Sequence, residues 1–296
     1  MNRLFRVAHL IRLILTEGKF RHSGHDFQNA RSKALEGLTQ FCPAPDGTIK
    51  NRPVLKNPFV RSWFGQAVFI KNALKRKGRH LSAPALNLCY IRNPKAASTA
   101  LTYAMLSACH PELKDFALTP EKINFLADVT LNQQLSSAQR EWVFFSVVRN
   151  PFARIVSVYR EFFERRHDHF LYEDYLFGIL REDHSFRQFL HILQVIPDRL
   201  KDQHLTPQYT LLTFYERQGV QVKILKLEEP EAVHQFLYPY GLTLKAINKR
   251  EAYDYRTYFD KETLELVYRL YHKDIHHFGY EAVLLELKQR VGAKNA

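Results

Sequence analysis

The sequence predicts an α/β protein in which a central parallel sheet is flanked by helices. Three short segments are predicted to be strands, and they cover residues 86–91, 142–148 and 220–227. The second is a continuous apolar run of the kind expected of a strand buried on both faces. Helical patterns and long connections separate these segments, which favours a parallel sheet. No internal repeat is visible in the chain.

The helices are predicted from periodicity and from their first residues. A turn at Asn93-Pro94 precedes a helical pattern from Ser98 to about Ala108. After the second strand, Asn150 is a suitable N-cap and Pro151 a suitable first helical residue. The apolar stripe of this helix consists of Phe152, Ile155, Val156, Tyr159, Phe162 and Phe163. A last amphipathic helix is expected from Lys261 to about His276.

The first 85 residues differ from the rest of the chain. Residues 20–85 are polar and show little periodicity, so we expect residues 1–85 to form a helical or irregular extension that packs on a core domain of residues 86–296. Residues 1–20 have the pattern of an amphipathic helix, in which basic residues lie beside an apolar stripe. The stripe consists of Leu4, Val7, Leu10, Ile11, Ile14 and Leu15. Such a helix either docks on its own domain or contacts an anionic membrane peripherally. Since no run of about 18 uncharged residues occurs, we expect a cytoplasmic protein.

Composition limits the class of partner. Of the 296 residues, 43 are Lys or Arg and 30 are Asp or Glu, which gives a formal charge of +13. A hydrophobic content of 46% excludes a disordered basic tail. The charge instead favours an anionic partner, such as nucleic acid, a membrane, an acidic polymer or a phosphorylated ligand. Cys42, Cys89 and Cys109 form no C-x-x-C pair, which favours buried thiols in a reducing compartment.

Residues 92–99, with the sequence RNPKAAST, join the first strand to a helix. This arrangement points backbone N–H groups and the helix dipole at one place. Lys95 adds a cation there, and Ser98 and Thr99 add hydroxyl donors, so the loop suits a phosphate-like anion. A capped helix beside a surface lysine is the alternative. A loop for nucleoside triphosphate hydrolysis is not expected, because no glycine occurs between Leu81 and Thr102 and Lys95 lies three residues before Ser98.

A second candidate anion site lies 54 residues after Lys95. Arg149 is at the carboxyl end of a predicted strand, where ligands bind in open α/β sheets. Ser157 follows eight residues later, on a helix face that we expect it to share with Arg154 and Glu161. Arginine binds phosphate bidentately, and a helix-borne hydroxyl could assist it. An ion pair at the start of a helix is the alternative.

These two segments resemble the motifs of sulfotransferases that use 3′-phosphoadenosine 5′-phosphosulfate (PAPS). RNPKAAST is similar to the 5′-phosphosulfate motif, most closely to the form found in heparan and uronyl 2-O-sulfotransferases. The resemblance implies that Lys95 contacts the bridging oxygen and stabilises the leaving phosphate. It also implies a set of residues that bind the 5′-phosphosulfate, namely Arg92, Ala96, Ala97, Ser98 and Thr99. Arg149 and Ser157 match the pair that holds the 3′-phosphate in this family.

Three later segments extend the resemblance to about residue 281. Residues 202–208 (DQHLTPQ) are similar to a D-x-H-x-x-P-Q segment of carbohydrate sulfotransferases. Residues 222–229 resemble a later strand that ends in acidic residues, and residues 255–280 resemble the closing helix with its D-x-x-x-F-G-Y ending. The resemblance implies a P-loop-like sulfotransferase fold.

Sulfuryl transfer to a hydroxyl also needs a general base. His204 is the first candidate, because it lies in a Pro-bounded loop of a family-like segment; binding the acceptor or stabilising the loop are its alternative roles. Glu161, on the helix face of Ser157, is the second candidate. His110 is expected to cap a helix. Two histidine groups, His167-Asp168-His169 and His272/His276, lack a third ligand at a usual spacing, so no metal is expected.

The sequence therefore predicts a bacterial-type enzyme that moves a sulfuryl group from PAPS to a carbohydrate hydroxyl. Its product would be 3′-phosphoadenosine 5′-phosphate (PAP), and its acceptor an acidic polysaccharide or a glycolipid. A non-enzymatic binder of polyanions or nucleic acid is an alternative, but the basic residues are dispersed and no nucleic-acid motif occurs. A nucleotide-dependent kinase of related fold is another, which the missing Gly-Lys-Ser/Thr sequence argues against.

Overall fold

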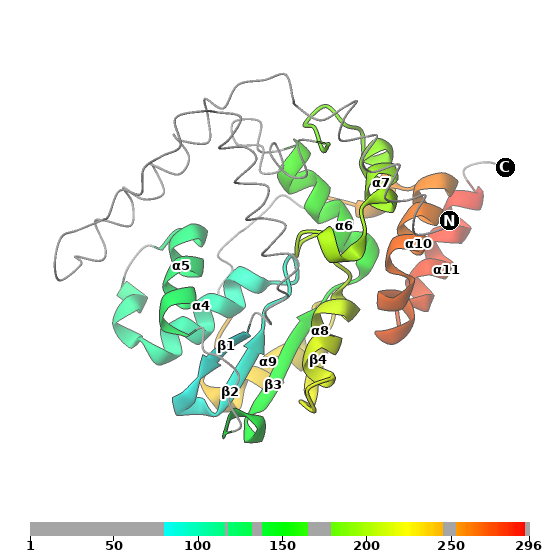
Figure 1. The fold of residues 1–296 in the computed structure, drawn as a ribbon. Helices are drawn as coiled ribbons and strands as arrows, with labels where there is room; N and C mark the ends of the chain where they lie inside the picture. Colours follow the sequence, from blue (N-terminus) through cyan, green and yellow to red (C-terminus); the bar gives the residue numbers. More distant parts are fainter. Residues whose placement is uncertain (1–79, 116–117, 132–137, 165–178, 245–252, 294–296) are drawn as a thin grey trace, which may run out of the picture. The chain divides into compact units, whose positions relative to one another are not determined.

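A computed structural model describes residues 80–115, 118–131, 138–164, 179–244 and 253–293 (Figure 1). The chain divides into two compact units. The sheet unit lies within residues 77–159 and 201–296, and the helical unit within residues 1–76 and 160–200. The predicted N-terminal helix, Cys42 and the His167-Asp168-His169 group lie outside the described residues.

A four-stranded sheet forms the centre of the sheet unit, in the order β1-β2-β3-β4. The strands are β1 (His80–Ala83), β2 (Leu88–Ile91), β3 (Val143–Val148) and β4 (Val222–Lys226). Strands β2, β3 and β4 are parallel, while β1 is antiparallel to β2. The predicted α/β class and its three strands are thus confirmed, but the sheet is mixed, not wholly parallel.

Strand β1 was not predicted, because His80 and Ser82 interrupt its apolar pattern. The irregular structure expected up to residue 85 is therefore wrong for His80–Ala83, and the sheet begins before residue 86. A 3-10 turn, η1 (Pro84–Leu86), and the left-handed Asn87 (φ 48°) close the β1–β2 hairpin. The last four residues of the predicted 86–91 strand form β2. All four residues of β1 are buried, and the buried His80 has a polar partner, because its Nδ1 lies 3.2 Å from the Tyr215 hydroxyl.

Helices connect the parallel strands and follow the last one (Figure 1). Between β2 and β3 lie α4 (Ser98–Cys109), η2 (Pro111–Asp115), α5 (Pro120–Thr130) and η3 (Ala138–Glu141). In the sheet unit, α6 (Pro151–Tyr159) and α8 (Gln208–Glu216) precede β4. After β4 come α9 (Pro230–Leu237), η7 (Tyr238–Tyr240), η8 (Tyr255–Tyr258), α10 (Lys261–His277) and α11 (Glu281–Ala293). The predicted helices at 98–108 and 261–276 are confirmed as α4 and α10.

Helix α6 begins as predicted but is more buried than expected. Asn150 Oδ1 accepts a hydrogen bond from the Phe152 backbone N–H at 3.0 Å, so Asn150 caps the helix and Pro151 is its first residue. All nine residues of α6 are buried, including Arg154 and Ser157, so the helix has no exposed polar face. The α-helix ends at Tyr159, and a π-helical turn, η4 (Arg160–Glu164), continues the chain into the helical unit.

The described part of the helical unit contains η4, α7 (Phe186–Val195) and η6 (Asp198–Leu200). A capping box starts α7, because the Ser185 and Gln188 side chains each bond the other's backbone N–H. Phe163 and Phe189 pack with their ring centroids 4.9 Å apart. This aromatic contact joins η4 to α7.

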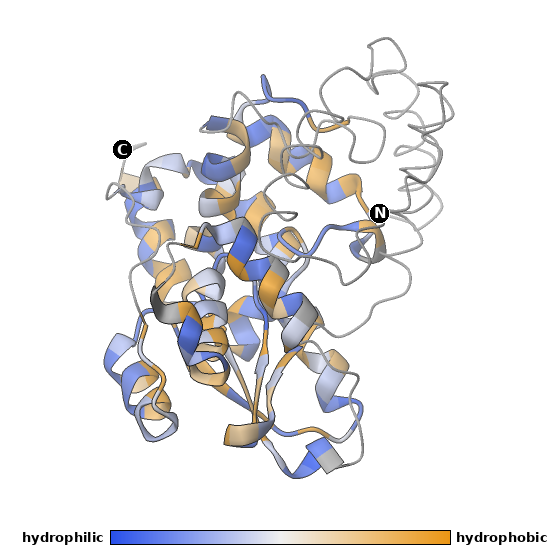
Figure 2. Cartoon of the chain, turned by 90° about the vertical axis from the view of Figure 1, so that its left-hand side faces the viewer, coloured by the Kyte–Doolittle hydropathy of each residue, from blue (hydrophilic) through white to orange (hydrophobic). Residues whose placement is uncertain are grey.

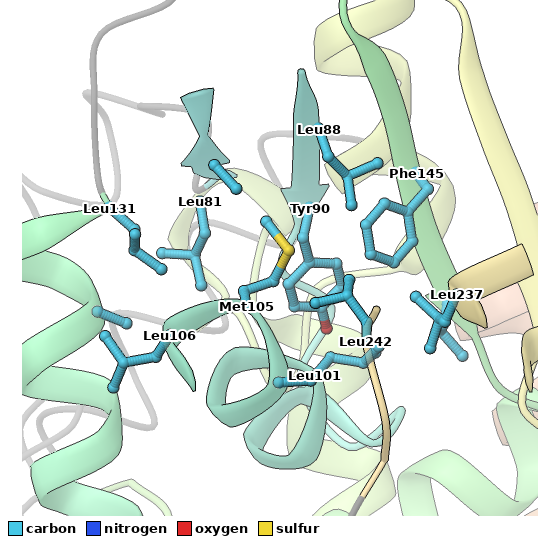
Figure 3. Packing of buried hydrophobic residues seen from close by; sticks show 14 of the residues in the cluster. Leu81, Leu88, Tyr90, Leu101, Met105, Leu106, Leu131, Phe145, Leu237 and Leu242 are labelled. Carbon is cyan, nitrogen blue, oxygen red and sulfur yellow. The ribbon is translucent and has the colours of Figure 1, made fainter. Parts of the chain in front are cut away.

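Buried apolar side chains on one face of the sheet pack against α4, α5 and α9 (Figure 3). The residues labelled there are Leu81, Leu88, Tyr90, Leu101, Met105, Leu106, Leu131, Phe145, Leu237 and Leu242. On the other face, Tyr215 of α8 packs against Phe144. Helices carry hydrophobic and hydrophilic residues side by side (Figure 2), as expected where one helix face is buried. Among the described helices, none is long and apolar enough to cross a membrane.

The two described cysteines are free thiols. Cys89 lies in β2 and is fully buried, and this burial raises its pKa to about 11. Burial also raises the pKa of Cys109, at the end of α4. Both thiols are therefore protonated and unreactive near neutral pH.

Candidate active site

The loop of residues 92–97 joins β2 to α4 at the carboxyl edge of the parallel strands. Lys95 (φ 69°) and Ala97 (φ 55°) both adopt left-handed backbone conformations without being glycine. Such residues cost about 1–3 kcal/mol each and persist where surrounding contacts hold them, often at ligand sites. Turns of this kind gather backbone N–H groups into an anion-binding concavity. The loop thus makes, without glycine, the kind of turn that glycine makes in other phosphate loops.

The N-terminus of α4 lacks a capping side chain. Ala97 is its N-cap and offers no side-chain acceptor. The first N–H groups of a helix otherwise need an acceptor, and an anion can supply it. An ordinary side-chain cap, which the alternative of a capped helix beside a surface lysine would place at the N-cap, is not made by Ala97. Lys95, Ser98 and Thr99 are partly exposed here, whereas Ala96 is buried.

Arg149 lies next to this loop, although it is 54 residues away in sequence. Its Nη1 donates to the Lys95 carbonyl oxygen at 3.2 Å. The parallel pairing of β2 with β3 explains this contact, because it brings the carboxyl ends of both strands to the same edge. The two predicted anion sites therefore adjoin. Ser157 follows in the second turn of α6, with 6% of its surface exposed.

The Arg92 guanidinium contacts α5. It forms an ion pair with the Asp128 carboxylate and donates a hydrogen bond to the Asn124 side chain. In this structure the side chain of Arg92 thus joins the β2–α4 loop to α5. Its predicted contact with a phosphosulfate stays a prediction.

A buried amide network lies under the loop. Asn93 is fully buried, and its Nδ2 donates to the Val147 carbonyl oxygen at 2.9 Å and to Gln208 Oε1 at 2.7 Å. Gln208, the first residue of α8, also contacts the backbone of Arg149. The sequence contains Asn93 and Gln208 within family-like segments, but their roles were not predicted.

Arg154 of α6 is 1% exposed, and its guanidinium binds backbone carbonyl oxygens. Its Nε donates to the Pro94 carbonyl oxygen at 3.0 Å, Nη1 to that of Thr206 at 3.2 Å and Nη2 to that of Gln203 at 3.1 Å. The guanidinium thereby connects the Lys95 loop to the loop that carries His204. The sequence places Arg154 on the helix face of Ser157, and in the structure its guanidinium donates to these three carbonyl oxygens.

His204 has a carboxylate partner two residues before it. Its Nδ1 lies 2.5 Å from Asp202 Oδ1, and the His204 side chain is 26% exposed. A carboxylate at Nδ1 favours the tautomer with the proton on that nitrogen, so the basic lone pair belongs to Nε2. Burial raises the pKa of Asp202, but the His204 charge and hydrogen bonds outweigh burial and hold this pKa below its usual range.

Asp274 of α10 binds the start of α8, which follows the His204 loop. It is fully buried and accepts the backbone N–H groups of Gln208 at 2.9 Å and of Tyr209 at 2.8 Å. Asp274 thus caps α8, whose own N-cap residue is Pro207. Burial raises the pKa of Asp274, while these hydrogen bonds and the charge of Arg154 oppose that shift. Asp274 belongs to the D-x-x-x-F-G-Y segment, to which the sequence alone assigned no role.

Glu228, which follows β4, also holds other segments in place through hydrogen bonds. Glu228 Oε1 accepts the Asn150 backbone N–H at 2.7 Å, and Oε2 accepts the Tyr280 hydroxyl at 2.9 Å. Burial first, and then Glu228, raises the pKa of Tyr280, so this hydroxyl stays protonated. Glu228 therefore joins the start of α6 to the segment before α11.

The remaining sequence candidates lie elsewhere. Glu161 lies in η4 of the helical unit. His110 is the C-cap of α4, as predicted, and pairs with Glu112 at 3.3 Å. His276, on α10, pairs with Glu281 at 3.2 Å. Within the described ranges, no group of three or more His, Cys, Asp or Glu side chains could hold a metal ion.

The geometry suits a ligand with two anionic groups. The left-handed loop, the α4 N-terminus and Lys95 offer one binding place, and Arg149 offers a second beside it. A model of the sulfotransferase family matches residues 79–281, which is well over half of the chain and spans all these elements. No curated protein and no solved structure matched the chain significantly. The chain therefore belongs to the sulfotransferase family and is an enzyme of sulfuryl transfer.

Proposed function

We propose that this enzyme transfers a sulfuryl group from PAPS to a hydroxyl group of a carbohydrate. The observation that carries the donor assignment is the contact of Arg149 Nη1 with the Lys95 carbonyl oxygen at 3.2 Å. It brings an uncapped helix N-terminus and two cationic residues to one edge of the sheet. PAPS carries a 5′-phosphosulfate and a separate 3′-phosphate, so its charges match two adjacent anion sites.

When bound, PAPS supplies an activated sulfuryl group on its 5′-phosphate. Lys95 and the N-terminus of α4 stabilise the negative charge that develops on that phosphate as the sulfur–oxygen bond breaks. Arg149, with Ser157, holds the 3′-phosphate and so fixes the donor in line with the acceptor. Arg92, Ala96, Ala97, Ser98 and Thr99 complete the 5′ site.

A base takes the proton of the acceptor hydroxyl while the hydroxyl oxygen attacks the sulfur. The bond between the sulfur and the bridging oxygen breaks, and PAP leaves with that oxygen. We assign this role first to His204, because Asp202 holds its Nδ1 and orients the ring. Arg154 supports the assignment, since it fastens the His204 loop to the Lys95 loop. Glu161 in the helical unit is the second candidate for the base.

For the acceptor we propose an acidic polysaccharide or a glycolipid. The formal charge of +13 exceeds what a donor nucleotide needs, and the excess favours an anionic acceptor or an anionic membrane that carries it. We further propose a cytoplasmic location, with peripheral membrane contact through the basic N-terminal segment.

The test measures PAP binding by calorimetry and sulfate transfer from radiolabelled PAPS to a panel of glycans. Lys95→Ala should lower kcat by about 10²-fold or more, because it removes charge stabilisation of the leaving group. Arg149→Ala should raise the Kd of PAP about tenfold or more, because it removes a charge-assisted phosphate contact. Lys288→Ala, on the outer helix α11, is the control and should change neither value.

Wild-type protein that neither binds PAP nor transfers sulfate would refute the proposal. Salt-sensitive heparin or DNA binding that survives Lys95→Ala and ignores PAP would indicate the polyanion binder instead. ATP-dependent phosphoryl transfer would indicate the kinase. Sulfate transfer to non-carbohydrate hydroxyls alone would contradict the acceptor assignment.

A further inference from the structure

Gln208 lies between the two anion sites and bonds to both. Its Oε1 accepts from Asn93 Nδ2 at 2.7 Å, on the loop of Lys95, and from the Arg149 backbone N–H at 2.9 Å. Its Nε2 donates to the Arg149 carbonyl oxygen at 2.7 Å and contacts Asp274 Oδ2 at 3.5 Å. One fully buried side chain thus joins segments that are more than fifty residues apart.

Only a primary amide can make this set of bonds. Two donors approach the oxygen of Gln208 and two acceptors surround its nitrogen, so its hydrogen-bonding capacity is fully used. A carboxylate would face the Arg149 carbonyl oxygen with a second acceptor. An apolar side chain would leave the Asn93 amide and both backbone groups of Arg149 without this partner, and buried polar groups without partners are costly.

Gln208 is itself held in place. Asp274 accepts its backbone N–H at 2.9 Å, and α8 begins at this residue. The backbone that carries the Gln208 side chain is therefore held in place, close to the sheet edge that carries both sites. Arg149 Nη1 also bonds to the Lys95 carbonyl oxygen, but Arg149 is only partly buried, whereas Gln208 is fully buried.

We propose that Gln208 is a positioning residue that sets the spacing of the two anion sites for a nucleotide phosphorylated at both its 5′ and 3′ positions. The inference rests on the proposed PAPS donor and deepens it. When two sites are preorganised at the spacing of the ligand, the second phosphate binds with little further loss of freedom. Gln208 then governs the advantage of a bisphosphorylated nucleotide over a monophosphate, not the affinity of either single site.

The experiment measures the Kd of PAP, adenosine 5′-monophosphate and adenosine 3′-monophosphate by calorimetry, and needs no acceptor. Wild-type protein should bind PAP at least about a hundredfold more tightly than either monophosphate. Gln208→Ala and Gln208→Glu should reduce that ratio about tenfold or more, while each monophosphate Kd changes less than about threefold. Thermal unfolding confirms that each variant is folded.

A buried glutamine elsewhere in the sheet unit supplies the matched control. Gln139 of η3 is 4% exposed and donates to Ser82 Oγ at 3.4 Å, before β3 and away from both loops. Gln139→Ala should lower thermal stability and leave the ratio of the dissociation constants unchanged. A purely structural role for Gln208 predicts the same behaviour for both glutamines.

Three results would overturn the inference. The first is an unchanged ratio in a folded Gln208 variant, and the second is an equal weakening of all three nucleotides. The third is a wild-type protein that binds PAP no more tightly than a monophosphate, which decides the matter even if both variants unfold. Asn93→Ala cuts the same connection from the loop side and should lower the ratio too. Wild-type protein that binds none of the nucleotides refutes the PAPS donor instead.

Discussion

At the scale of single residues, the site depends on buried polar side chains that hold backbone in place. Arg154 donates to the carbonyl oxygens of Pro94, Gln203 and Thr206, and lies near enough to Asp274 to influence its pKa. Asn93 and Gln208 join the same two loops through amides. The partly exposed Lys95, Arg149 and His204 therefore stand on backbone that other residues fix.

Replacing Arg154 should destabilise the sheet unit strongly. Arg154→Met leaves three carbonyl groups and the buried Asp274 without this charge, so the free energy of unfolding should fall by about 3 kcal/mol. Arg154→Lys should recover little of it, because a single ammonium cannot serve carbonyls in three directions. Urea unfolding measures both values.

Arg256→Met provides the comparison for Arg154. Arg256 bonds to Glu286 at 2.7 Å on the surface, where ion pairs contribute about 1 kcal/mol or less. If Arg154→Met costs no more than Arg256→Met, the three carbonyl contacts do not support the fold as described.

At the scale of elements, the helices differ in what accepts hydrogen bonds from their first backbone N–H groups. Asn150 caps α6, and a capping box of Asp260 with Thr263 caps α10, so both of these caps are local in sequence. Asp274 caps α8 from α10, 66 residues further along the chain. At the N-terminus of α4 the N-cap is Ala97, whose side chain cannot cap the helix, and this is the end at the proposed donor site.

Removing the distant cap should cost more than removing a local one. Asp274→Ala leaves two N–H groups of α8 without this acceptor, one buried and one partly buried, and we expect a loss of about 2–3 kcal/mol in the free energy of unfolding. Asp274→Asn keeps one acceptor oxygen and should lose about half as much. Asp260→Ala, at the α10 N-cap, should cost about 1 kcal/mol. Equal losses at the two aspartates in chemical unfolding would contradict the distinction.

At the scale of the whole molecule, the ionisation of Asp202 beside His204 makes the stability of the fold depend on pH. Burial opposes ionisation of Asp202, but His204 and nearby hydrogen bonds hold its pKa below the usual value. A carboxyl group with a lowered pKa in the folded state stabilises the fold above its unfolded pKa of about 4. That stabilisation is lost as the pH falls through the folded pKa.

The stability gap between wild type and Asp202→Asn should therefore depend on pH. It should be largest above about pH 4 and shrink as the pH falls below that value, because wild-type Asp202 then takes up a proton. Thermal unfolding between about pH 3 and pH 6 measures the gap. A gap that stays constant over this range would show that the Asp202–His204 contact does not lower the pKa of Asp202.

Local patterns in the sequence determined the strands β2, β3 and β4, the helices α4, α6 and α10, the cap at Asn150 and the two motifs around Lys95 and Arg149. These features depend on residues within a few positions of one another, so periodicity and spacing reveal them. Only the tertiary structure decided that β1 completes the sheet, that α6 is buried on all sides, and that Arg154, Gln208 and Asp274 bind backbone. Their partners are about fifty or more residues away, and a buried amide or guanidinium can serve a ligand or a backbone carbonyl equally well. Which of the two it serves follows from where the packed strands and helices bring the chain.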